Sequence, residues 1–160
     1  MRWNPVGGRV GDSIATAGRL IWRLGSGIWL GTLVFFSLSV TPTIFGVLGA
    51  QRAAPLIDRL FPAYYALALW SGGFALAGVL LLRMDYRARW RRWSVGCAAL
   101  AYGLTWLAVG VLGQMRGAGR GYFSALHEVS VFLNLLEILA LLAAMVSDAL
   151  ADAPAKVNLH

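Results

Sequence analysis

The segment that decides the fold spans residues 123–147 and reads FSALHEVSVFLNLLEILALLAAMVS. It is long and apolar enough to cross a hydrocarbon layer of about 30 Å as one helix. Four polar residues form a stripe along it, and they are His127, Ser130, Asn134 and Glu137. At about 100° per residue they share an arc of about 80° on a helix. Because a carboxylate in lipid is costly, we expect the stripe to face a protein interior, a cavity or another subunit, and we predict that it marks the functional site.

The composition of the whole chain indicates a small integral membrane protein. Of its 160 residues, 59% are hydrophobic and only 13% are charged, and the mean hydropathy is +0.67. Three further segments, residues 27–48, 62–84 and 93–114, have the length and character of membrane spans. We therefore predict an all-α fold, an integral membrane four-helix bundle over residues 27–147, with an N-terminal arm at 1–26 and a tail at 148–160.

The basic residues are distributed unevenly between the two sides of this bundle. Ten of the fourteen Lys and Arg residues lie on the arm, the middle loop and the tail, and four lie in the other two loops. This bias predicts that both termini are cytoplasmic, in what we expect to be a bacterial inner membrane. The net charge of +7 is thus explained by membrane orientation, so the expected partner is the lipid bilayer and not nucleic acid.

The N-terminal arm is amphipathic. Its apolar face is formed by Val10, Ile14, Ala17, Ile21 and Leu24. Such a segment either lies on the membrane surface or extends the first span inward, and the sequence leaves both open. Residues 53–61 show the same pattern, and we expect a short surface helix there. The first 40 residues also resemble a signal peptide, but their apolar run continues past Pro42 without an Ala-x-Ala site, so we expect a retained span.

The predicted orientation brings several features together on the outer side. The residues expected there at similar depth are Thr41, Pro42, Tyr64, Tyr65 and His127. Pro42 removes a helical hydrogen bond, so the first span should be distorted near its outer end. Glu137 lies about 15 Å deeper than His127 along the helix. The two side chains therefore cannot pair, and each needs a partner on another helix, a water molecule or a ligand.

Glycines are the residues expected to bring the helices close together, because small side chains permit backbone approach in lipid. Gly27 and Gly31 form a GxxxG pattern on the first span, and Gly72, Gly73 and Gly78 lie on the second. The third span repeats glycine every seven residues, at Gly96, Gly103 and Gly110. We expect this seam to pack within the monomer, with a homodimer face as the alternative.

Two sequence blocks resemble the transmembrane protein 205-like family. The first contains Leu60, Phe61, Pro62, Tyr64 and Tyr65, and the second contains His127, Ser130, Asn134 and Leu135. The resemblance covers roughly residues 20–148 and implies a four-span membrane protein without established chemistry, whose animal members are linked to drug and platinum resistance and vesicle trafficking. The layout more distantly resembles the copper resistance protein D group and a membrane-bound haem-dependent protoporphyrinogen oxidase. That oxidase uses a membrane lysine, whereas the sole lysine here is Lys156 in the tail.

The stripe residues allow structural and chemical roles. His127 could be hydrogen-bonded between helices, could be an axial ligand of a haem or chlorophyll-type pigment, or could belong to a proton or metal path. Glu137 is expected as a protonated acid bonded to Asn134 or to a facing hydroxyl, a state that a proton relay also uses. Cys97 is the only cysteine, so the chain can form neither an internal disulfide nor a thiolate cluster.

These features favour a non-enzymatic membrane protein. No catalytic residue is predicted, because neither a nucleophile motif nor a phosphate-binding loop is present. The leading hypothesis is an accessory or stabilising subunit of a larger bioenergetic membrane complex, or a small transport-related factor. The expected protein partner is that complex or a second copy of the chain. The alternative is a haem-, tetrapyrrole- or copper-binding redox protein that uses His127.

Overall fold

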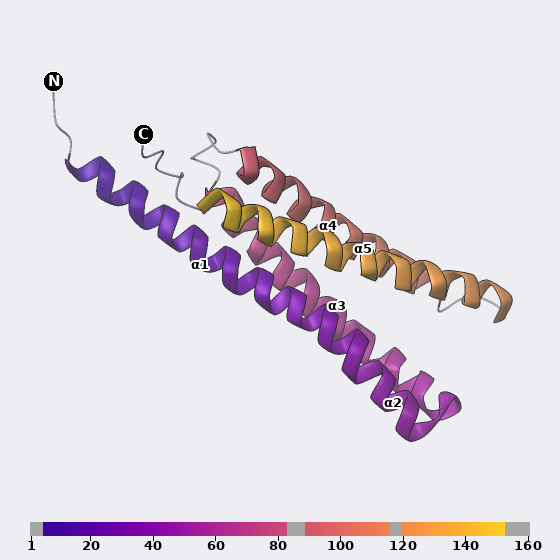
Figure 1. Ribbon diagram of the computed structural model, residues 1–160. Coiled ribbons are helices and arrows are strands. Elements are labelled where there is room, and N and C mark those ends of the chain that lie inside the picture. The colour runs from indigo at the N-terminus through magenta and orange to yellow at the C-terminus, as the bar shows by residue number, and fades with distance from the viewer. Residues whose placement is uncertain (1–4, 83–88, 116–119, 153–160) are drawn as a thin grey trace, which may run out of the picture.

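The computed structural model describes residues 5–82, 89–115 and 120–152, with side chains over 11–82, 90–115 and 125–152. Within these ranges the chain is helical, and its elements are α1 (Pro5–Phe35), a π-helix (Phe36–Val40), α2 (Thr41–Leu48), α3 (Ala50–Leu81), α4 (Arg89–Met115) and α5 (Arg120–Asp152) (Figure 1). Four stretches are long and apolar enough to cross a membrane: Gly11–Leu48, Ala50–Leu81, Trp90–Met115 and Ala125–Asp152. The predicted all-α membrane fold is confirmed. The first residues of the arm and the tail beyond residue 152 lie outside the described ranges.

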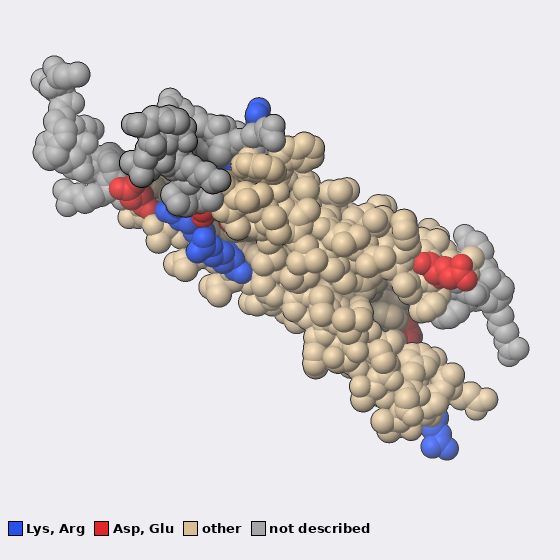
Figure 2. All heavy atoms as spheres, in the orientation of Figure 1, with Lys and Arg blue, Asp and Glu red and all other residues tan. Residues whose placement is uncertain are grey.

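The long helices associate as two pairs, α1 with α3 and α4 with α5. Additional contacts join α3 to α4 and α1 to α5. The pairs lie together at the end that holds both chain termini, here called the terminal end, and diverge toward the other end, here called the α2 end (Figure 1). In the space-filling view the Lys, Arg, Asp and Glu side chains lie toward these two ends (Figure 2). This distribution is typical of a protein whose middle is embedded in hydrocarbon.

Helices α1 and α3 pack with very little space between their backbones. Trp22 and Trp29 of α1 are seven residues apart and fully buried against small residues of α3. A Cβ atom on Gly78 would meet the backbone of Trp22, and one on Gly25 would lie 2.6 Å from the backbone nitrogen of Ala75. Glycine thus permits the close approach expected of membrane helices.

Helices α4 and α5 pack along an alanine-rich seam and not along the expected glycine seam. The buried seam residues of α4 are Ser94, Ala98, Ala101, Thr105 and Ala108. Gly96, Gly103 and Gly110 are exposed, and a Cβ atom on any of them would have no neighbour within 4 Å. Their predicted packing inside the monomer is therefore wrong. The reason is angular, because a residue two positions from a seam alanine lies about 200° around the helix.

The GxxxG pattern of the first span likewise lies outside the helix contacts that it was expected to form. Gly27 and Gly31 have open space where a Cβ would be, whereas Gly18 and Gly25 lie against α3. On α3 the prediction holds better, since Gly72 and Gly78 are both buried in the helix contact.

The distortion expected near Pro42 takes the form of a π-helix. Proline has no N–H, so it cannot donate a hydrogen bond to the carbonyl four residues earlier. Just before it, the Thr41 N–H bonds to the Phe36 carbonyl, five residues back. The helix is widened locally and continues into α2, where Pro42 occupies the tolerated first turn.

Two helix starts lie earlier than predicted. Helix α3 begins at Ala50, not at residue 62, so the expected surface helix at 53–61 is the first part of α3, and Ala53 and Ile57 are buried. Helix α1 begins at Pro5 and continues into the first span without interruption, which favours the extension alternative for the arm. Its buried face there carries Gly18 and Trp22, whereas Ile14 and Leu24 are exposed.

Candidate functional site

The centre of the candidate site is the carboxyl group of Glu137 on α5. This residue is 1% exposed, and its Oε1 atom accepts two hydrogen bonds from two other helices. Trp29 Nε1 of α1 donates at 2.9 Å, and Thr105 Oγ1 of α4 lies at 2.6 Å. The ring of Tyr102 meets the Trp29 indole edge to face, with centroids 6.1 Å apart, and so helps to fix the donor. A single oxygen of Glu137 therefore joins three helices.

Glu137 lies near the middle of the membrane-spanning length of α5. The acidic residues that flank it on α5, Glu128 and Asp148, are twenty residues apart, which is about 30 Å and equals the thickness of a hydrocarbon core. Glu137 is about 14 Å from Glu128 along the helix axis. The carboxyl group is therefore placed where charge is most expensive.

The Thr105 hydroxyl gives this site two possible hydrogen-bond arrangements. Its oxygen lies 2.6 Å from Glu137 Oε1 and 3.3 Å from the carbonyl oxygen of Ala101. A hydroxyl has only one proton to donate. Thr105 can therefore donate a hydrogen bond to an ionised Glu137, or it can accept a hydrogen bond from the neutral acid while it donates one to the Ala101 carbonyl. Trp29 donates in both arrangements.

A second set of polar side chains continues from Glu137 toward the α2 end. Asn134 Nδ2 donates to Ser37 Oγ at 2.9 Å and to the Tyr64 hydroxyl at 3.3 Å. One turn further, the partly buried Ser130 lies near the Tyr65 hydroxyl. Asn134 Oδ1 is buried and has no hydrogen-bond partner in the described structure. The polar groups thus extend about 10 Å along α5, from Glu137 to Ser130.

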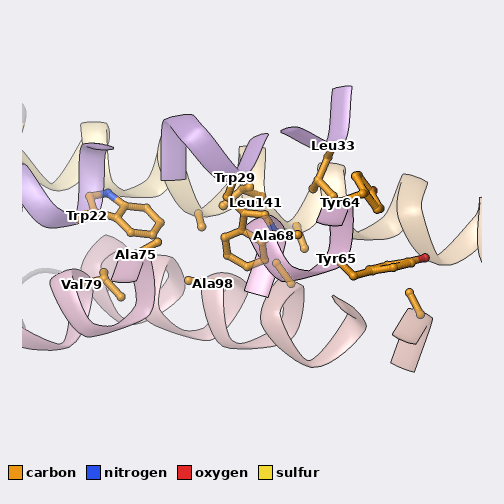
Figure 3. Close-up of a cluster of buried hydrophobic side chains, with 14 of the residues drawn as sticks. Trp22, Trp29, Leu33, Tyr64, Tyr65, Ala68, Ala75, Val79, Ala98 and Leu141 are labelled. Atoms are coloured by element: carbon orange, nitrogen blue, oxygen red, sulfur yellow. The ribbon is translucent and has the colours of Figure 1, made fainter. Parts of the chain in front are cut away.

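The opposite direction, toward the terminal end, is mainly apolar. Leu141 and Ala144 follow Glu137 on α5 and are fully buried. They pack in one cluster with Trp22, Val79 and Ala98 from the other three long helices. Figure 3 shows Trp22 and Val79 at one end of this cluster and Tyr64 and Tyr65 at the other. Glu137 therefore lies between a half of the interior where polar side chains bond across helices and a half that is mainly apolar, with buried hydroxyls at Ser26, Ser71, Ser94 and Ser147.

The remaining predicted residues lie outside this interior. His127 and Pro42 are exposed and Thr41 is partly exposed. The expected common depth of His127 and Tyr64 is wrong, because Tyr64 meets Asn134, about 10 Å further along α5 than His127. The early start of α3 accounts for this displacement. Ligation of a haem, a chlorophyll-type pigment or copper by His127 stays a prediction.

No cluster in the described part of the chain has the composition of a metal centre. Within residues 5–82, 89–115 and 120–152, no three His, Cys, Asp or Glu side chains are placed to hold one ion. Cys97 is a partly buried free thiol that packs against the apolar core.

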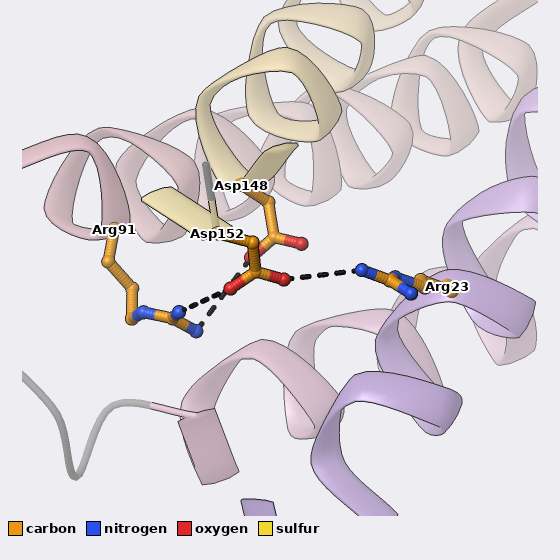
Figure 4. Close-up of polar contacts among 4 residues, drawn as sticks. All are labelled: Arg23, Arg91, Asp148 and Asp152. Carbon is orange, nitrogen blue, oxygen red and sulfur yellow. Dashed lines mark hydrogen bonds and ion pairs between the residues drawn. The ribbon is translucent and has the colours of Figure 1, made fainter. Parts of the chain in front are cut away.

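A buried ion cluster closes the terminal end (Figure 4). Arg91 Nη2 of α4 lies 3.0 Å from Asp152 Oδ1, and its Nη1 lies 3.9 Å from Asp148 Oδ1. Asp152 Oδ2 also pairs with Arg23 of α1 at 3.2 Å. The side chains of Arg91 and Asp148 are only 11% and 5% exposed. Residues expected to begin a separate tail thus hold three helices together.

Comparison with known proteins places the chain in a family. Residues 24–116, more than half of the chain, match a family described as a domain of unknown function (DUF4149). The chain belongs to the DUF4149 family. An uncharacterized protein of Aquifex aeolicus (strain VF5) is 40% identical over 48 residues, which are 30% of this chain and 36% of that protein. The match therefore spans about a third of that relative. No solved structure matches the chain.

The DUF4149 match contains only part of the site. Trp29 and Thr105, which bond to Glu137, lie within residues 24–116, whereas Glu137 lies beyond them. Sequence reasoning missed both partners, although each had a signal. Trp29 repeats the position of Trp22 after seven residues, and Thr105 interrupts the alanine series of α4. A polar residue within an otherwise small, buried seam indicates a partner on the facing helix.

Proposed function

We propose that this DUF4149 protein is a non-enzymatic transport-related factor of the bacterial inner membrane. We further propose that the Glu137 carboxyl group takes part directly in transport. The observation that carries the proposal is a fully buried carboxyl group at mid-membrane depth, hydrogen-bonded to Trp29 and Thr105. Ionisable groups at this depth are rare and typically belong to ion or proton paths. The more specific resemblance to the transmembrane protein 205-like family is compatible with this role and stays a prediction.

A flux measurement tests the proposal. Vesicles that contain the wild type should conduct protons, an alkali cation or a small anion faster than protein-free vesicles. E137Q retains an acceptor oxygen for Trp29 and Thr105, so it should fold with a near-normal Tm and still lose this flux. E137L should insert at least as well as the wild type, because it removes a costly carboxyl group, and should also lose the flux.

Leu139→Ala is the matched control, because Leu139 lies two residues away and is exposed. It should conduct like the wild type. If vesicles with the wild type conducted none of the three kinds of ion faster than protein-free vesicles, the transport role would be contradicted. Full ion flux in E137Q would show that Glu137 has only a structural role.

A second candidate role is that of an accessory or stabilising subunit of a larger membrane complex. It is favoured by the glycine face of α4, formed by Gly96, Gly103 and Gly110, which no helix of the described chain covers. Close approach of another helix would use such a face, whether from a larger complex or from a second copy.

Substitution of Gly103 by Leu separates packing inside the chain from packing against a partner. Gly103 is exposed and a Cβ atom there would have no neighbour within 4 Å, so the Tm of the isolated protein should not fall. Co-purification with larger membrane subunits, or dimer formation in mild detergent, should be lost. Leu107→Ala, at an exposed non-glycine position, is the control. Unchanged assembly of Gly103→Leu would contradict the subunit role for this face.

A further inference from the structure

Side-chain hydrogen bonds between helices continue from the Glu137 region toward the α2 end, whereas the buried Ser26 and Ser71 on the other side bond to carbonyl oxygens of their own helices. We propose that Glu137 exchanges protons with the aqueous phase at the α2 end, and not with that at the terminal end. The inference rests on the proposed function, since it names the proton as the species that the Glu137 site takes. It also assigns the side from which that proton arrives.

The route toward the α2 end consists of Asn134, Tyr64, Ser130 and Tyr65. Asn134 lies about one helical turn before Glu137 on α5, and its buried Oδ1 is an open acceptor for a water molecule. The Tyr64 hydroxyl accepts a hydrogen bond from Asn134, and the Tyr65 ring lies against Tyr64 with centroids 4.8 Å apart. Toward the α2 end the two helix pairs diverge and end in separate lobes with a notch between them (Figures 1 and 2). Water from this end thus has a polar lining to follow.

The route toward the terminal end is interrupted. From Glu137 to Asp148 the helix advances about 16 Å. The fully buried apolar residues over this distance are Leu141 and Ala144, packed with Trp22, Val79 and Ala98, and all five are less than 2% exposed. The buried hydroxyl groups of Ser26 and Ser71 in this half bond to carbonyl oxygens of their own helices. The buried Ser94 and Ser147 lie within three residues of Arg91 and Asp148, next to the ion cluster. Protons move through hydrogen-bonded groups, and the five apolar side chains provide no such link between Glu137 and the cluster. The ion cluster of Arg91, Asp148 and Asp152 then closes the end itself.

The proton transfer can be written with all atoms accounted for. A water molecule held at Asn134 gives a proton to the Glu137 carboxylate and receives one from the next water toward the α2 end. The neutral acid can then donate to Thr105 Oγ1, whose own proton turns to the Ala101 carbonyl. The groups that face Glu137 are Trp29 of α1, Tyr64 and Tyr65 of α3, Thr105 of α4 and Asn134 of α5, and none of them carries a formal charge at neutral pH.

Infrared spectroscopy of oriented vesicles tests the side of exchange. The carboxyl C=O band of Glu137 is assigned as the band that E137Q lacks, and orientation is read from protease cleavage of a C-terminal tag. A pH step on the α2 side should change this band promptly, and a step on the terminal side should leave it unchanged while the vesicle stays sealed. A response from the terminal side, or from neither side, would overturn the inference.

Two variants test the route itself. Asn134→Leu removes the polar step and should slow the band change by about tenfold or more. Ser26→Ala removes a buried hydroxyl in the other half and should leave the rate unchanged. Equal rates in both variants and the wild type would contradict the route. If vesicles conduct another ion and the Glu137 band follows neither side, this inference fails while the proposed transport role stands.

Discussion

Replacing Arg91 with Ala should lower the free energy of unfolding by about 3–5 kcal/mol. Arg91 is the only described cation that pairs with both Asp148 and Asp152, and its side chain is 11% exposed. Its removal leaves Asp148 buried without a cationic partner in the cluster. An uncompensated buried charge costs far more than the ion pair itself contributes. Unfolding in mixed micelles, followed by circular dichroism, measures the loss.

Arg23→Ala is the matched control for Arg91→Ala. Arg23 pairs with the same Asp152 carboxylate, but its side chain is 62% exposed. Exposed pairs contribute about 0–1 kcal/mol, so this variant should be nearly as stable as the wild type. Adding Asp148→Asn to Arg91→Ala should recover part of the loss. If Arg91→Ala and Arg23→Ala were equally stable, the ion cluster would have no role in holding α4 and α5 together at the terminal end.

Substitution of Gly78 by Ala should destabilise the protein by about 1–3 kcal/mol or more. One methyl group at this position would overlap the Trp22 backbone, which cannot move aside as a flexible side chain could. The α1–α3 pair would have to separate, and Trp22 would lose part of its burial. The thermal unfolding midpoint in detergent checks the prediction.

Gly103→Ala makes the same chemical change where nothing lies within 4 Å. Alanine favours a helix over glycine by about 1 kcal/mol, so the control should be neutral or slightly stabilising. Gly78→Ala is thus expected to lower the stability of the protein, whereas Gly103→Ala should leave it unchanged or raise it slightly. A Gly78→Ala protein as stable as the wild type would show that α1 and α3 do not approach as closely as described.

The spacing of polar residues predicted which side of α5 faces the bundle, but not the partners of these residues. Asn134 and Glu137 point into the bundle and Ser130 is partly buried, as a stripe on an apolar helix suggests, whereas His127, the fourth residue of the predicted stripe, is exposed. The periodicity of one helix cannot identify Trp29 or Thr105, because their proximity depends on how four helices pack. A hydroxyl opposite Glu137 was expected from the cost of an isolated carboxyl, and Thr105 fills this role. The indole donor was not expected.

The glycines show why small residues alone are insufficient for predicting a membrane interface. Both glycine and alanine permit close approach, and α4 carries a series of each on opposite sides. The alanine series includes Ser94 and Thr105, whose polar groups favour a protein environment, whereas the glycine series contains no polar residue. This difference identifies the inward face, and the glycine spacing does not.

The π-helix changes how the first span should be compared with its relatives. It absorbs one additional residue, so the residues after Val40 are rotated by about 100° relative to an uninterrupted α-helix. A single helical wheel drawn from α1 into α2 would therefore assign the wrong faces to residues 41–48. Two wheels are needed, one ending at Phe35 and one starting at Thr41. A family member that lacks one residue here could form an unbroken α-helix and still present the same side of α2.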